Sequence, residues 1–150
     1  MFRNPRIVRR TRAGIELHLG ADQRRLVGEL IGELRELLET DDPGLRRLFP
    51  TAYPDDPERD AAYQILARSE LVDRRQASLD LVTRSLDAEV LQPDEAEAWM
   101  NAVNQVRLVL GTRLDVGEDD EVYDPDAPDA MARAVYFFLG VLLEHFVEAL

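Results

Sequence analysis

The segment from about Asp129 to Leu150 constrains the fold more than any other part of the sequence. Fifteen of its last 20 residues are apolar. The pattern predicts a helix, and a helix that is apolar on nearly every side is either central to a core or shared between subunits. Its longest uninterrupted apolar run, Ala134 to Leu143, falls short of the roughly 18 residues that a membrane span needs. We therefore expect a soluble domain built around this helix.

Three earlier segments also carry apolar residues at helical spacing. The first covers about 22–40, with Asp22 as its expected N-cap. The second covers about 60–90, and the sequence leaves open whether it is one helix or is interrupted. The third runs from Gln92 to about Leu110, where Gly111 is a natural C-terminal cap.

Two short segments before these helices have the pattern of strands. Ile15, Leu17 and Leu19 alternate with polar residues, and Arg12-Ala13-Gly14 is a plausible turn after the strand that begins at Ile7. The predicted fold is mainly α, a β-hairpin followed by about five helices. We expect a single domain over 1–150, with an arginine-rich hairpin at 1–20 and a helical body at 21–150.

Before the second long helix, Tyr53-Pro54-Asp55-Asp56-Pro57-Glu58 resembles a cluster of metal-binding carboxylates. A helix start explains the same residues better. Asp56 is suited to the N-cap, Pro57 to the first helical position, and Glu58 to the positive end of the helix dipole. The sequence therefore predicts a cap at this point.

Charge divides the chain into a small basic part and a large acidic part. The net charge is −12, and all 18 basic residues are arginine. The first twelve residues contain no acid, whereas the rest of the chain holds 13 arginines against 30 acidic residues. Most of the surface should repel nucleic acid, and only this N-terminal arm should attract it. The candidate nucleic-acid contacts are therefore Arg3, Arg6, Arg9, Arg10 and Arg12.

An acidic segment follows the third predicted helix. Eight acidic residues and no basic residue lie between Arg113 and Arg133, together with Pro125 and Pro128. The order of these acids lacks the alternating ligands of a calcium loop. We interpret 115–129 as a solvated loop or a segment that contacts another protein.

The residue inventory argues against catalysis. Without cysteine there is no disulfide, thiolate metal site or thiol chemistry, and without lysine there is no Schiff base or Walker motif. The serines, Ser69, Ser78 and Ser85, fall inside a predicted helix and are expected at its surface. His18 and His145 are far apart and lack metal-ligand spacing. We expect no enzyme activity, no cofactor and no bound metal.

One helix face offers an alternative nucleic-acid contact. Asn101, Asn104 and Arg107 share a face of the third helix, and these side-chain types read adenine and guanine edges. Acidic residues crowd the start of that helix, which is the end that usually approaches the bases. A solvent-facing polar stripe explains the pattern better.

The final helix also predicts a homodimer. A domain of this size has limited room to cover such a helix on all sides, and an isologous contact is the commonest way to do so. The expected interface residues are Val135, Phe138, Leu142 and Phe146.

Two segments resemble landmarks of a known family. The stretch from Trp99 to Leu114 resembles the signature segment of the actinobacterial family named for its oxidative-stress transcriptional regulator, AosR. Phe49-Pro50-Thr51-Ala52-Tyr53-Pro54-Asp55-Asp56-Pro57 resembles the second landmark, and the strand Gly14 to Leu19 lies in the expected order. The resemblance spans nearly the whole chain.

The resemblance implies a regulator of redox-linked gene expression that works with the transcription machinery. Separately, Met1 to Arg12 do not have the pattern of a signal peptide, so we expect a cytoplasmic location. Family genes tend to neighbour a Clp protease adaptor, which implies the alternative of an adaptor or scaffold without nucleic-acid binding. The chain departs from the family's expected chemistry in one respect. Redox sensing by such a regulator would use cysteines, and this chain has none.

Overall fold

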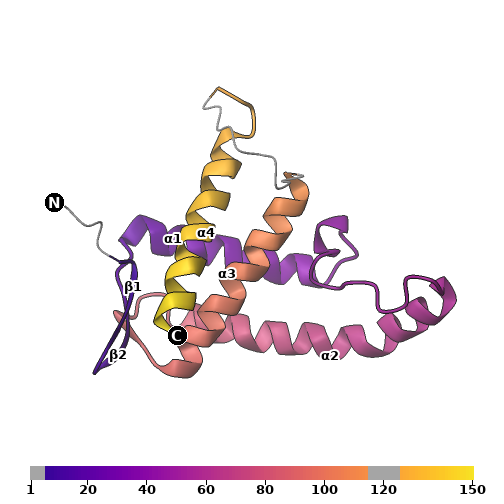
Figure 1. Ribbon diagram of the computed structural model, residues 1–150, viewed down its shortest axis with the longest axis horizontal. Helices are drawn as coiled ribbons and strands as arrows, with labels where there is room; N and C mark the ends of the chain where they lie inside the picture. The colour runs from indigo at the N-terminus through magenta and orange to yellow at the C-terminus, as the bar shows by residue number, and fades with distance from the viewer. Residues whose placement is uncertain (1–5, 115–125) are drawn as a thin grey trace.

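The structure is a computed structural model that describes residues 6–114 and 126–150. It confirms a mainly α fold with a small N-terminal sheet (Figure 1). The described residues contain four α-helices and one 3-10 turn, not five helices. The segment predicted as helical at 60–90 contains one uninterrupted helix, but that helix ends at Arg84 and Val90 lies in a strand. The elements are β1 (Val8–Thr11), β2 (Gly14–Leu17), α1 (Ala21–Leu38), η1 (Pro43–Leu45), α2 (Pro57–Arg84), β3 (Val90–Leu91), α3 (Pro93–Arg113) and α4 (Ala130–Ala149).

The predicted hairpin is present, and a third short strand extends it. β1 pairs antiparallel with β2, and β2 pairs with β3 in the register Ile15↔Leu91. Gly14 has φ of +138°, a conformation that side chains rarely adopt, and a Cβ there would lie 2.8 Å from the Leu91 carbonyl oxygen. Glycine at this turn therefore allows the hairpin and β3 to approach each other closely.

Helix α3 lies at the centre of the fold and contacts α1, α2, α4 and the sheet. Its Trp99 is fully buried and stacks on Phe146 of α4, with 6.1 Å between the ring centroids. The Trp99 indole Nε1 donates a hydrogen bond of 2.8 Å to the hydroxyl of Ser85, which is also buried. The expectation of a surface position was therefore wrong for Ser85, which ends α2 inside the core.

The helix boundaries follow local capping chemistry, with two differences from expectation. Asp56 caps α2 as predicted, and its carboxylate accepts a hydrogen bond of 3.1 Å from the Arg59 amide. Helix α1 starts at Ala21, so Asp22 lies in its first turn instead of capping it. Helix α3 continues past the expected stop, and Gly111 lies buried within it.

The first half of α2 extends away from the body of the molecule (Figure 1). Ile65 and Leu66 are among the apolar residues whose spacing predicts this helix, yet they are 79% and 82% exposed. The buried residues of α2, Val72, Leu79 and Val82, all lie in its second half or at its middle. Helical spacing identified an apolar stripe along α2, but no helix or strand in the described part of the chain covers Ile65 and Leu66.

Helix α4 packs against α3 and β1 through one face. Leu139, Leu142 and Phe146 are buried on that face, while Phe137 and Val141 are exposed on the other. Within the described residues, α4 alone is long and apolar enough to span a membrane by length and composition.

Candidate functional site

The structure describes four of the five candidate arginines of the N-terminal arm, and Arg3 lies outside the described residues. Arg6 forms an ion pair with Glu148 at the end of α4, with 3.1 Å between nitrogen and oxygen. Arg9 and Arg10 are exposed on β1, and Arg12 is exposed at the turn. The side chains of these last three form no hydrogen bond or ion pair within the described residues.

Arg24, which the sequence analysis did not single out, shows how other arginines are used. Its guanidinium donates to the backbone carbonyls of Leu17, Leu19, Leu86 and Ala88 at 2.7–3.0 Å. It thereby ties β2 and the segment before β3 to α1. No sequence signal distinguishes Arg24, because every residue offers a backbone carbonyl as a partner.

The polar face predicted on α3 is divided between two environments. The Arg107 guanidinium lies over the Tyr136 ring of α4, 4.8 Å from its centroid. Asn101 and Asn104 line a cleft between α3 and α2. The three side chains therefore do not form one exposed surface against which a DNA groove could lie.

The expected dimer interface is only partly on the surface. Leu142 and Phe146 are fully buried within the chain, since α3 covers that side of α4, and they offer no surface to a second subunit. Val135 and Phe138 are half-buried. The exposed apolar residues of α4 are instead Met131, Phe137, Val141 and Val147. The expectation of an interface position was therefore wrong for Leu142 and Phe146, which are core residues of the single chain.

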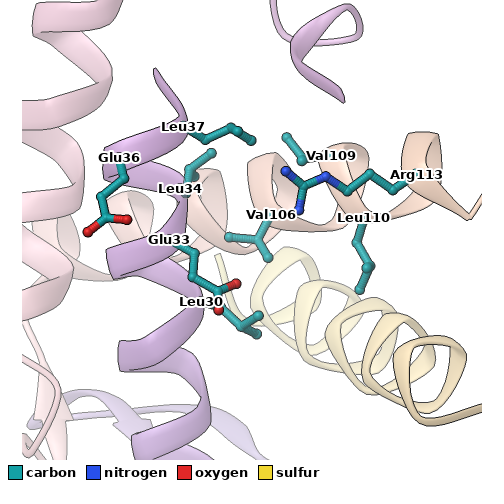
Figure 2. Close-up of a pocket in the computed structure, with 9 residues that line it drawn as sticks. All are labelled: Leu30, Glu33, Leu34, Glu36, Leu37, Val106, Val109, Leu110 and Arg113. Atoms are coloured by element: carbon teal, nitrogen blue, oxygen red, sulfur yellow. The ribbon is translucent and has the colours of Figure 1, made fainter. Parts of the chain in front are cut away.

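A groove of about 310 Å³ separates α1 from α3 (Figure 2). Its floor is apolar, with Leu34, Val106 and Val109 buried. Glu33 and Glu36 from α1 and Arg113 from α3 form its polar rim, and Arg113 also pairs with Asp42 at 3.7 Å. The groove has the lining of a surface that receives an apolar side chain or helix face.

Residues 6–114 and 126–150 offer few side chains that could bind a metal ion together. No group of three or more histidine or acidic side chains lies close enough there to hold a metal ion. The His18 side chain is exposed, and its Nε2 lies 3.0 Å from a carboxylate oxygen of Glu16. His145 Nδ1 accepts a hydrogen bond of 3.0 Å from the Ile7 amide, which gives it a structural role. Most of the acidic loop, 115–125, lies outside the described residues.

Fold and sequence together define a small helical domain with a three-stranded sheet and surfaces suited to binding. The chain belongs to the family described as "Domain of unknown function (DUF2017)", whose model matches residues 4–150. This finding agrees with the resemblance carried by the segments around Trp99 and Phe49.

The chain is also similar to curated mycobacterial proteins. It is 35% identical over 127 residues to "Oxidative stress regulator AosR" of Mycobacterium tuberculosis and of Mycobacterium bovis, over 73% of this chain and 58% of each relative. It is 34% identical to "Putative oxidative stress regulator AosR" of Mycobacterium leprae, over 73% of this chain and 59% of that protein. The chain thus spans a little over half the length of these relatives. No solved structure matches it.

Proposed function

We propose that this chain is a non-enzymatic regulator of the oxidative stress response, acting in the cytoplasm on transcription. It works by contact with the transcription machinery, with a weak DNA contact through the hairpin. The names of its mycobacterial relatives support a regulatory role.

The observation that carries the proposal is the set of unpaired arginines on the hairpin. In a chain with 30 acidic residues, Arg9, Arg10 and Arg12 stay exposed and form no ion pair within the described residues. Three cations within four residues make a local positive surface on an otherwise acidic protein. Such a surface attracts a phosphate backbone or an acidic protein face.

The test is genetic complementation under oxidant challenge. Transcripts are profiled after mild peroxide in a strain that lacks the protein and in strains that carry variants of it. We expect the deletion to alter the response and the triple variant R9A/R10A/R12A to fail to restore it. The control R25A/R46A/R47A removes the same charge from other exposed positions and should restore it. A deletion strain with an unchanged transcript response would contradict the proposed role.

The groove between α1 and α3 favours a second candidate, an adaptor or scaffold linked to Clp-type proteolysis without nucleic-acid binding. An apolar floor with Glu33 and Glu36 at the rim suits an amphipathic helix with basic flanks. Affinity capture from native lysate, with and without nuclease, separates the two candidates. The adaptor predicts capture of a Clp component that resists nuclease and is lost with Leu37→Glu but kept in R9A/R10A/R12A. Capture of RNA polymerase components that depends on the hairpin arginines would favour the regulator.

A further inference from the structure

A second cleft, about 280 Å³ in volume, lies between α2 and α3 and is lined almost entirely by polar side chains. Its position differs from that of the hairpin and of the apolar groove. Cores and helix contacts are normally apolar, so a polar lining at a helix junction needs an explanation. The lining residues are Leu71, Arg74, Arg75, Ser78, Asn101, Asn104 and Gln105.

Arg75 brings an uncompensated charge to this cleft. Its Nη2 donates to the Leu48 carbonyl at 2.9 Å, and its guanidinium lies 5.4 Å from the centre of the Phe49 ring. Its Nε is buried without a hydrogen-bond partner, and no carboxylate pairs with it in the described residues. Burial lowers the pKa of the Arg75 guanidinium from its usual value. An anion at this position would offset the cost of burying the charge.

Gln105 leaves a second polar group unsatisfied. Its side chain is 6% exposed, and its Oε1 is buried without a hydrogen-bond partner. A buried amide that forms no hydrogen bond destabilises the fold, and such groups are rare in native proteins. They often indicate a site completed by something bound.

The remaining polar groups of the cleft are also free to bind. The side chains of Ser78, Asn101 and Asn104 form no hydrogen bond with any described residue. Arg74 pairs with Glu70 at 2.6 Å, but both side chains are largely exposed. An exposed pair of this kind contributes little stability, so Arg74 can turn toward a ligand at small cost.

We propose that the cleft between α2 and α3 binds a small molecule through an oxyanion group, a carboxylate or a phosphate. Arg75 and Arg74 supply the positive charge, and charge-assisted hydrogen bonds from guanidinium groups suit both anions. Ser78 and Asn104 supply neutral donors, and Gln105 holds a polar substituent beside the anion. The volume limits the ligand to a molecule smaller than most cofactors. This inference goes beyond the proposed function, since a regulator needs no such ligand to bind its partner.

The experiment is an NMR titration of the full-length protein labelled with ¹⁵N. Side-chain amide signals of Asn101, Asn104 and Gln105 and the Nε–H signal of Arg75 are followed. Inorganic phosphate and acetate are the two probes, and chloride at matched ionic strength is the control. We expect saturable shifts of these signals with at least one probe and none with chloride. A response to phosphate alone identifies a phosphate site, and a response to acetate identifies a carboxylate site.

Variants test the location of binding. Arg74→Ala and Asn104→Leu should each weaken the affinity by about tenfold, the scale of one strong hydrogen bond. Arg84→Ala removes an exposed arginine from the same helix outside the cleft and should bind as the unaltered protein does. Arg75→Gln should abolish binding. If the Arg75→Gln protein does not fold, Arg74→Ala and Asn104→Leu still test the location of the site. Absence of saturable shifts, or unchanged affinity in both Arg74→Ala and Asn104→Leu, would overturn the proposal.

Discussion

At the scale of single residues, several arginines link separate parts of the chain by donating hydrogen bonds to backbone carbonyls. Arg24 contacts four carbonyls, Arg75 contacts one, and Arg68 contacts the Thr40 carbonyl at 2.7 Å. Each of these bonds joins a helix to a loop or strand. The planar guanidinium suits this role because it carries five donors in a fixed arrangement.

Replacing Arg24 with alanine should lower the free energy of unfolding by about 2–4 kcal/mol, because it leaves partly buried carbonyls without donors. Arg24→Lys should recover little of that loss, since one ammonium cannot reach all four carbonyls. Urea unfolding of the purified variants measures both values. Arg25→Ala is the control, because its side chain is exposed and lies 3.8 Å from Asp22, and it should change stability by less than about 0.5 kcal/mol. A small effect for Arg24→Ala would contradict the assigned role.

The buried pair of Ser85 and Trp99 gives a second prediction. Ser85→Ala leaves the Trp99 indole N–H without an acceptor inside the core, so we expect a loss of about 1–3 kcal/mol in unfolding free energy. Ser69→Ala changes an exposed serine on the same helix and should have an effect within about 0.5 kcal/mol. Thermal unfolding followed by Trp99 fluorescence provides the measurement. Equal midpoints for the two variants would show that the hydrogen bond contributes nothing.

At the scale of elements, the hairpin predicts the character of any DNA binding. The five arm arginines neutralise at most about five phosphates, so log affinity against log salt should have a slope no steeper than about −4.5. The ion pair between Arg6 and Glu148 should make the slope shallower still. Gel shifts at several salt concentrations measure it. R9A/R10A/R12A should abolish binding, and R25A/R46A/R47A should not. DNA binding that persists in R9A/R10A/R12A would indicate a contact through Asn104 and Arg107 on α3.

The elements differ in how far their sequences determine them. The alternation at Ile15 and Leu17 was sufficient to predict β2, and Asp56 was sufficient to predict the start of α2, because both signals are local. The exposure of Ile65 and Leu66 could not be predicted, since spacing shows which side of a helix is apolar but not whether another element covers it. Strand β3 has two residues, too few for any periodicity to register.

The candidate site was predictable only in part, for the same reason. Charge counting identified the hairpin arginines, and the structure leaves three of them unpaired. The interface predicted on α4 included two core residues, because a helix that is apolar all round does not reveal which side its own chain will cover. Neither the groove between α1 and α3 nor the cleft between α2 and α3 was predicted, since each is lined by two helices and the spacing within one helix does not show how it packs against another.

At the scale of the whole molecule, the exposed face of α4 predicts a homodimer. Phe137 and Val141 are about half exposed there, an unfavourable arrangement for a lone chain in water. Size exclusion with light scattering at low micromolar concentration should give about twice the chain mass of 17.1 kDa. The double variant F137E/V141E should be monomeric. The control I65E/L66E alters exposed residues on α2 and should stay dimeric. A monomeric unaltered protein would refute the prediction.

The contacts between the hairpin and α4 also bear on how the protein is made. The hydrogen bond from Ile7 to His145 joins residues 138 positions apart, and the ion pair from Arg6 to Glu148 reinforces it. Because synthesis runs from the N-terminus, α4 must leave the ribosome before β1 can form its contacts with α4. Until then β1 lacks its contacts with α4, and the hairpin is held by β3, α3 and the hydrogen bonds from Arg24 of α1. The hairpin therefore reaches its final packing only after α4 has been synthesised.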